Sequence, residues 1–148
     1  MHVTHGIDEL MALAGTDLGE TEPVVVGPEA IGVFDHATGD GRRTYVEHAA
    51  QGSLGTTITH GYLALSLVPV LLKKLLRIEG FSHGVNYGLD KVRFPAPLLA
   101  GSSVRASARV VEVARIEGGV QPKLRVDVRA EGADEACCVA KVIYRYLL

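Results

Sequence analysis

The sequence contains no tryptophan, and aromatic residues make up only 5% of its 148 residues. It is also poor in cysteine, because Cys137 and Cys138 are the only two and lie side by side in an apolar, strand-like run. Neighbouring cysteines cannot readily form a disulfide with each other. The sequence therefore predicts reduced thiols in the core and a reducing compartment.

An excess of charge of either sign is missing as well. The 15 basic and 17 acidic side chains give a net charge of −2, which gives no indication of nucleic-acid binding. Residues 1–15 lack the basic start and the long apolar core of a secretory signal. The longest apolar run, Tyr62–Leu72, is too short to span a bilayer. We therefore expect a soluble cytoplasmic protein that binds neither nucleic acid nor a membrane.

The common motifs of cofactor and metal sites are also absent. There is no P-loop, no GxGxxG segment, no GxSxG segment and no Cys/His cluster with metal-ligand spacing. We therefore expect no cofactor and no metal. What remains for chemistry is Asp40 and the pair His60-Gly61, among six histidines in all.

What the sequence does contain is a long apolar stretch in its middle, Gly55–Ile78. Within Tyr62–Leu72 every residue except Ser66 is apolar, and the apolar residues form no one-sided stripe. This pattern predicts one long helix that is buried on nearly all faces. Pro69 is expected to kink this helix or to force an irregular turn near Leu65.

Strands are predicted around this helix. Ahead of it come a short helical piece at residues 7–14, a strand at 23–27 and a helix that begins at Pro28. The pattern predicts a single α+β domain over residues 1–148, in which a three- to four-stranded antiparallel meander wraps around one long central helix. Such a sheet has a free edge, which pairing in a dimer would cover. The strand-like segments after the helix are Val85–Phe94, Val104–Ile116, Lys123–Ala130 and Ala136–Leu147.

Two short segments could carry chemistry. Asp40 follows Thr38-Gly39 in a turn-rich stretch, and His60-Gly61 begins the central helix. A backbone N–H at the start of a helix lies at the positive end of the helix dipole and can hold a developing oxyanion. A carboxylate on a nearby irregular loop can act as a general base. The alternative interpretation is structural, with a helix stop in the first segment and an ordinary helix start in the second.

Three segments resemble the MaoC-like (R)-specific enoyl-CoA hydratases. Phe34–Asp40 (FDHATGD) looks like the family segment F-A-x-x-T-G-D, and Gly55–Leu67 (GTTITHGYLALSL) resembles G-x-x-I-A-H-G-F-x-x-L-S-L. Asn86–Pro97 (NYGLDKVRFPAP) is similar to N-Y-G-x-x-K-V-R-F-P-A-P. The three segments occur in the family's order and spacing, and the resemblance covers roughly residues 10–148.

The resemblance implies a hotdog fold, a homodimer, and a substrate that is an acyl thioester of coenzyme A or of an acyl carrier protein. The acyl arm would lie in a tunnel beside the central helix. In the family, an Asp and a His five residues later hold a water that adds across the 2,3 double bond of a trans-2-enoyl thioester. Asp40 matches this Asp, and Gly61 matches the residue whose backbone N–H binds the thioester oxygen.

The sequence departs from the family where the catalytic His is expected. That position holds Tyr45, so the predicted catalytic set is Asp40, Tyr45 and Gly61. A neutral imidazole can accept a proton near pH 7, whereas a phenol donates a proton but is a poor base at that pH. His48, three residues later, or His36, one helical turn before Asp40, could replace the missing imidazole. Otherwise both are surface histidines.

Further residues are predicted to contact the substrate, namely His60, Tyr62, Ser66, Asn86 and Arg93. Ser66 could instead donate its hydroxyl to the carbonyl oxygen four residues earlier. Asn86 could instead be a structural residue at the start of a strand. Arg93 is a candidate for binding the phosphates of the carrier arm, with solvated surface charge as the alternative.

Three functions fit these residues. The first is a hydro-lyase of the (R)-specific enoyl-CoA hydratase or 3-hydroxyacyl thioester dehydratase type, with Asp40 as the base and Tyr45 in place of the usual His. The second is a hotdog enzyme diverted to dehydration, cyclisation or isomerisation in a specialised biosynthetic pathway. The third is a non-catalytic acyl-binding homologue. We favour the first because Asp40 and His60-Gly61 are retained.

Overall fold

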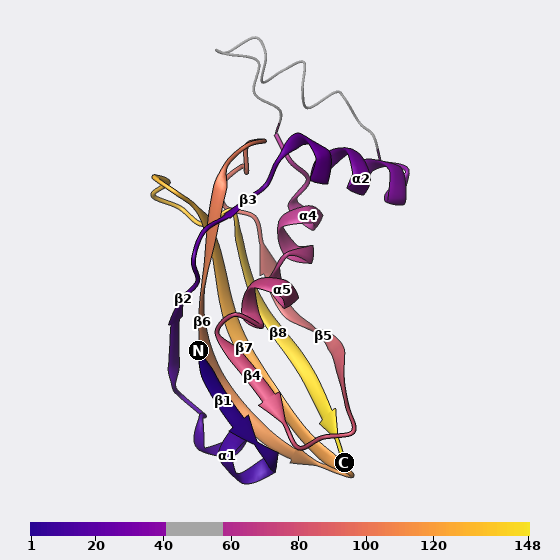
Figure 1. Ribbon diagram of the computed structural model, residues 1–148, viewed down its shortest axis with the longest axis vertical. Coiled ribbons are helices and arrows are strands. Elements are labelled where there is room, and N and C mark those ends of the chain that lie inside the picture. Colours follow the sequence, from indigo (N-terminus) through magenta and orange to yellow (C-terminus); the bar gives the residue numbers. More distant parts are fainter. Residues whose placement is uncertain (41–57) are drawn as a thin grey trace.

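The fold is a curved antiparallel sheet that holds two short helices in its concave face (Figure 1). The computed structural model describes residues 1–40 and 58–148. The two central helices are α4 (Gly61–Ser66) and α5 (Val68–Leu72), and their buried side chains pack against aliphatic side chains of the sheet. This arrangement confirms the predicted α+β class with a sheet wrapped around a central helical segment.

Six strands form the main sheet, and five of them follow the order β2-β6-β7-β8-β5. The remaining strand, β3, pairs with β6 beside β2. All of these pairs are antiparallel. The strands are β2 (Asp17–Glu20), β3 (Val24–Val25), β5 (His83–Arg93), β6 (Ser103–Ile116), β7 (Gly119–Ala130) and β8 (Cys138–Leu147).

The predicted meander is confirmed in its three-stranded form, β6-β7-β8, and β5 does not extend it to four strands. A four-stranded meander would place β5 beside β6, whereas β5 pairs with β8. Residues 94–102 therefore carry the chain from one side of the sheet to the other. The reason is that β2 and β3 already occupy the second edge of β6, so β5 takes the edge of β8.

Alternating side chains and local irregularities together explain how the sheet covers the helices. In β6 the side chains of Val104, Ala106, Ala108 and Val110 are buried, as the period of two predicts. The pairing register then shifts between Val110 and Glu112, and β5 contains two more shifts of this kind. Such bulges increase the local twist and bend a strand. They let the sheet curve around α4 and α5.

The central helix is interrupted close to Pro69. Leu67 is both the C-cap of α4 and the N-cap of α5, and Pro69 lies in the first turn of α5. Proline is tolerated there because its missing N–H would have no partner within the helix. The predicted turn is therefore present, two residues after Leu65.

The extent and the burial of the central helix differ from the prediction. Of the described residues after position 57, the first helical one is Gly61, and Leu76–Glu79 forms strand β4 instead of further helix. Tyr62 and Val70 are 69% and 59% exposed, so one face of the helical segment points away from the sheet. A single sheet covers only one side of a helix, and burial of the other side requires an additional partner.

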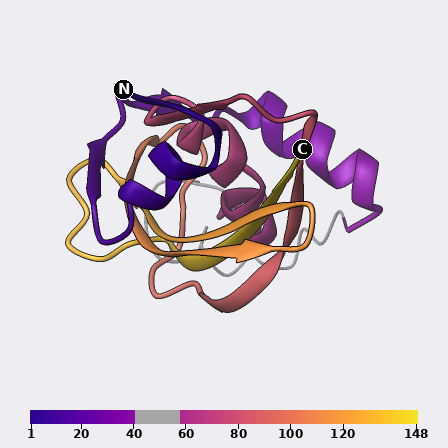
Figure 2. The ribbon, with the colours of Figure 1, turned by 90° about the horizontal axis from the view of Figure 1, so that it is seen from below.

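The N-terminal part of the chain contributes two helices and one strand of a second, two-stranded sheet. Strand β1 (His2–His5), which the sequence did not predict, pairs in parallel with β4. The helices predicted ahead of the central segment are present as α1 (Gly6–Ala12) and α2 (Pro28–Thr38). Helix α2 lies at the end of the sheet where α4 begins and stands clear of its curve (Figure 1 and Figure 2). Within the described part of the chain, no helix has the length and apolar character needed to cross a membrane.

Cys137 immediately precedes β8 and Cys138 begins it, and both side chains are buried. Both thiols are free, as predicted. Burial raises the pKa of both thiols, and that of Cys138 to about 11, because a thiolate would lose its hydration there. At neutral pH the two side chains therefore act as small apolar residues.

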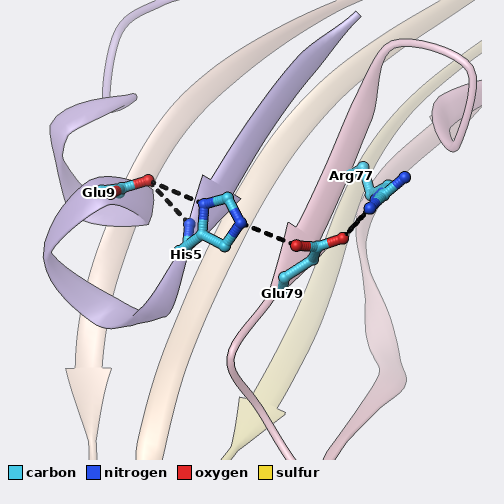
Figure 3. Close-up of polar contacts among 4 residues, drawn as sticks. All are labelled: His5, Glu9, Arg77 and Glu79. Atoms are coloured by element: carbon cyan, nitrogen blue, oxygen red, sulfur yellow. Dashed lines mark hydrogen bonds and ion pairs between the residues drawn. The ribbon is translucent and has the colours of Figure 1, made fainter.

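A chain of polar contacts fastens β1 to β4 at the surface (Figure 3). His5 Nε2 lies 2.8 Å from Glu79 Oε2, and His5 Nδ1 lies 3.5 Å from Glu9 Oε2. The Glu79 carboxylate also accepts a hydrogen bond from the Arg77 guanidinium. This hydrogen bond from Arg77, together with the neighbouring charges, holds the pKa of Glu79 below its usual value.

We expect Glu79→Gln to lower the melting temperature at neutral pH by about 1–3 °C, because exposed ion pairs stabilise a fold only weakly. A carboxyl group with a lowered pKa in the folded chain stabilises it above the unfolded pKa. This contribution is lost as the pH falls through the folded pKa. The difference from wild type should therefore fade as the pH falls from about 5 to 3.

Thermal unfolding followed by circular dichroism at several pH values checks this expectation. Glu117→Gln, in the turn between β6 and β7, is the matched control and should show no such pH-dependent difference. A difference for Glu79→Gln that stays constant across the acidic range would contradict the role given to the carboxylate.

Candidate active site

A pocket of about 320 Å³ lies between the end of α2 and the beginning of α4. Asp40 lies two residues after the end of α2, and His60 is the N-cap of α4, which begins at Gly61. The fold therefore brings together two segments that are twenty positions apart. The residues that line the pocket are Asp40, Ile58, Thr59, His60, Gly61, Tyr62 and Phe94.

The approach to α4 is fixed by backbone contacts with the segment that follows β5. Ile58 forms an isolated antiparallel bridge with Leu99. The Thr59 N–H donates a hydrogen bond to the Leu98 carbonyl oxygen at 2.7 Å. Gly61 then begins the helix. The first N–H groups of a helix have no partner within it, so they can bind an oxygen atom of a ligand.

The turn that ends α2 directs Asp40 out of the helix. Gly39 takes a left-handed conformation with a φ of 71°, and its N–H donates to the Asp35 carbonyl oxygen at 2.9 Å. The Thr38 hydroxyl donates to the Phe34 carbonyl oxygen at 2.8 Å and accepts from the Asp40 N–H at 3.3 Å. The Thr-Gly-Asp segment is therefore a helix stop, as the structural interpretation holds, and it also places Asp40 at the pocket.

His60 connects the two sides of the pocket. Its Nε2 lies 2.8 Å from the main-chain oxygen of Asp40 and 3.9 Å from Asp40 Oδ2. On the other side of the ring, Nδ1 lies 3.4 Å from Asp35 Oδ1. The ring also packs against Phe34, with the ring centroids 5.4 Å apart. Both ring nitrogens of His60 therefore face atoms of the protein.

Phe94 covers Gly61. A β-carbon at position 61 would lie 2.9–3.0 Å from three carbon atoms of the Phe94 ring, which is closer than real β-carbons approach their neighbours. The Phe94 ring in turn meets the Tyr62 ring edge to face, with centroids 6.1 Å apart and an interplanar angle of 87°. A larger side chain at position 61 would therefore have to displace the Phe94 ring.

Four of the predicted site residues meet in this pocket, namely Asp40, His60, Gly61 and Tyr62. The predicted catalytic residue Tyr45 lies outside the described residues, as does His48. His36 lies exposed on α2 and does not line the pocket.

Three predicted substrate contacts lie elsewhere. The Ser66 hydroxyl donates to the Tyr62 carbonyl oxygen at 2.7 Å, which is the structural alternative for this residue. Asn86 and Arg93 are exposed on β5, and Arg93 lies next to Phe94. None of the three lines the pocket. Their contacts with a substrate remain predictions.

Asp35 belongs to the site, although the sequence analysis did not single it out. Its Oδ1 atom is buried and faces His60 Nδ1. The sequence feature that could have indicated Asp35 is a mismatch with the family segment F-A-x-x-T-G-D, which has alanine at the position of Asp35. A carboxylate at that position is a departure from the family pattern.

The pocket offers groups for proton transfer. Within residues 1–40 and 58–148, no group of three His, Cys, Asp or Glu side chains is placed to hold a metal ion. The polar groups that can act on a bound molecule are the Asp40 carboxylate and the backbone at Gly61, because both ring nitrogens of His60 face protein atoms. A carboxylate can accept a proton and a backbone N–H can stabilise a developing oxyanion. This set suits an addition to, or an elimination from, a carbonyl compound.

The curved sheet around a central helix defines a hotdog-fold protein, and solved structures share this fold. A monoamine oxidase regulatory protein from Archaeoglobus fulgidus superposes with a TM-score of 0.75 at 23% identity, covering 99% of this chain and 96% of that one. An (R)-hydratase from A. caviae gives a TM-score of 0.66 at 19% identity, covering 88% and 94%.

The family follows from the sequence match. The MaoC like domain family matches residues 12–131. The 3-hydroxyacyl-thioester dehydratase Z of Mycobacterium tuberculosis is 39% identical over 150 aligned residues, which cover 99% of each chain. The chain therefore belongs to the MaoC like domain family, and the predicted family and hotdog fold are confirmed.

We expect Gly61→Ala to destabilise the protein by about 1–3 kcal/mol, because the new methyl group overlaps the Phe94 ring. The double variant Gly61→Ala/Phe94→Leu should recover part of this loss. Chemical denaturation measures both effects.

Gly32→Ala on α2 is the matched control. A β-carbon at that position meets no atom within 4 Å. In a helix, alanine is favoured over glycine by about 1 kcal/mol, so this variant should be neutral or more stable. Equal destabilisation by Gly61→Ala and Gly32→Ala would show that the contact with Phe94 is unimportant.

Proposed function

We propose that this protein is a hydro-lyase that interconverts a trans-2-enoyl thioester and an (R)-3-hydroxyacyl thioester carried by coenzyme A or an acyl carrier protein. The observation that carries the proposal is the single pocket shared by the Asp40 carboxylate and the Gly61 backbone. The activity named for the Mycobacterium tuberculosis relative supports the same reaction class. Tyr62 and Phe94 supply an apolar wall for the acyl arm.

In the hydration direction, the Asp40 carboxylate accepts a proton from water while the water oxygen forms a bond to C3. The electron pair of the 2,3 double bond moves towards the thioester carbonyl, and the resulting enolate oxygen accepts a hydrogen bond from the Gly61 N–H. A proton then bonds to C2 and completes the 3-hydroxyacyl thioester. Dehydration is the same sequence reversed.

Tyr45 is the proposed donor of the proton to C2. A phenol is a suitable acid and a poor base at neutral pH, so the basic role falls to Asp40. Loss of a well-placed acid–base partner commonly lowers a rate by about 10²–10⁴-fold. We therefore expect hydration to be slower than in a variant that carries histidine at this position.

The presence of Tyr45 also favours a second candidate function. On the same scaffold, Asp40 as base, Tyr45 as acid and the Gly61 N–H as carbonyl anchor would serve a cyclisation, an isomerisation or another dehydration. A non-catalytic acyl-binding homologue would have little use for Asp40 beside Gly61, so we rank this third.

The test is a hydration assay that follows the loss of enoyl-thioester absorbance with crotonyl-CoA and longer enoyl-CoAs. We expect Tyr45→His to raise kcat and Asp40→Asn to lower it by about 10²–10⁴-fold. Asp134→Asn, in the turn between β7 and β8, is the control and should leave kcat unchanged. If neither the wild type nor Tyr45→His turns over any enoyl thioester, the hydro-lyase proposal is wrong.

We also propose a homodimer that forms along the free edge of β5. Among the described strands, β5 pairs with β8 alone. Its exposed apolar side chains, together with that of the adjacent Phe94, are all more than 40% exposed: Val85, Tyr87, Leu89 and Phe94. A second copy paired with β5 would cover this edge. Because Phe94 and Tyr62 line the pocket, the partner would also shield the active site from water.

We expect Leu89→Glu to convert the dimer into monomers, because a charge would then lie in the paired edge. Val111→Glu on β6 is the matched control, since Val111 is 40% exposed and Leu89 is 44% exposed. Light scattering after size exclusion gives the mass of each species. A monomeric wild type would overturn the dimer, and equal dissociation by both variants would place the interface elsewhere.

A further inference from the structure

The imidazole of His60 lies between two acidic residues of one short segment. Nε2 is 2.8 Å from the Asp40 main-chain oxygen, and Nδ1 is 3.4 Å from Asp35 Oδ1. Asp35 lies in the last turns of α2 and Asp40 just beyond its end, whereas His60 caps the beginning of α4. The imidazole therefore joins the two elements that form the pocket.

The partner of Nε2 determines the direction of its hydrogen bond. A carbonyl oxygen only accepts hydrogen bonds, so Nε2 donates its proton to Asp40. Nδ1 and Asp35 Oδ1 are both buried and lie 3.4 Å apart, and within the described residues neither has a hydrogen-bond partner. A buried polar atom without a partner is costly, and a small rotation of the ring or of the carboxyl group would pair these two atoms with each other. Asp35 therefore fixes the orientation of the His60 ring.

We propose that Asp35 and His60 are positioning residues that together fix the Asp40 peptide relative to the Gly61 N–H. The hydrogen bond from His60 holds the backbone of the base, and His60 immediately precedes the residue that binds the thioester oxygen. Asp35 acts through His60, because it faces the ring nitrogen opposite to the one that bonds Asp40.

A direct role of His60 in proton transfer does not fit this geometry. Both ring nitrogens face protein atoms, so neither is directed at a substrate in the pocket. The arrangement instead resembles an orienting pair, in which a carboxylate holds an imidazole and the imidazole holds the backbone of the residue that reacts. The kinetic consequence rests on the hydro-lyase activity proposed above, whereas the contact itself does not.

Kinetics of the enoyl-thioester hydration give the first test. We expect Asp35→Ala and His60→Ala each to lower kcat by about 10- to 100-fold, with little change in KM, because small displacements of catalytic groups are costly. His60→Gln, which keeps an amide donor towards Asp40, should retain more activity than His60→Ala. Glu29→Gln, at the beginning of α2, is the control and should leave kcat unchanged.

The double variant Asp35→Ala/His60→Ala distinguishes positioning from independent roles. If Asp35 acts through His60, adding Asp35→Ala to His60→Ala should cost less than about twofold in kcat, since coupled residues are not additive. Losses that multiply, or an Asp35→Ala variant with the full wild-type kcat, would overturn the proposal.

Nitrogen-15 NMR of histidine-labelled protein gives a readout that needs no turnover. We expect Asp35→Asn to shift the Nδ1 resonance of His60, assigned by its loss in His60→Gln, and Glu29→Gln to leave it in place. If the wild type shows this coupling but hydrates no enoyl thioester, the positioning contact stands and the proposed function fails. If the wild type is active and Asp35→Asn leaves the Nδ1 resonance unchanged, the positioning proposal is wrong, whereas the proposed function stands.

Discussion

Covering the apolar segment between Gly61 and Leu72 is the constraint on which the rest of the structure depends. Leu63, Ala64 and Val68 are buried against the sheet, and each large aliphatic side chain removed from water stabilises the fold by about 1.5–3 kcal/mol. A flat sheet would leave much of the apolar surface of these helices exposed to solvent. The bulges in β5 and β6 supply the curvature, so irregular pairing is a requirement of the core.

The pocket lies between α2 and α4, and only its α4 side is held in place by the packing of the core. The beginning of α4 is anchored by the sheet and by the backbone contacts of Ile58 and Thr59. Helix α2 buries only Ile31 and stands at the end of the sheet. The contact between His60 and Asp40 is thus a direct link between a firmly packed element and a loosely packed one. Accuracy at the site depends on a few polar contacts.

Side-chain periodicity predicted the parts of the fold in which local sequence decides the structure. Apolar and polar residues alternate in Val104–Ile116 and Lys123–Ala130. This alternation predicted which side chains of β6 and β7 are buried, because alternate side chains of a strand lie on opposite faces. The turn at Leu67 followed from Pro69. The parallel pairing of β1 with β4 and the place of β5 beside β8 depend on contacts distant in sequence, which no local pattern records.

Motifs predicted which segments of the candidate site are close together, and the roles of their residues stay predictions. Asp40, His60, Gly61 and Tyr62 lie in the two segments that resemble family motifs, and the fold brings these segments to one pocket. The partnership of His60 with Asp35 could not be read in this way. It depends on the angle at which α2 meets α4, and a residue that departs from the family pattern carries no motif of its own.

The adjacent thiols of Cys137 and Cys138 have a practical consequence for this molecule. Because both thiols are buried, reagents in solution do not reach them. Because their pKa values are raised, little of the reactive thiolate is present. A thiol-specific dye can therefore react with them only when the β7–β8 region opens. The rate of labelling reports how often that opening occurs, without any engineered probe. The two native cysteines can therefore be used to measure the local opening of the sheet.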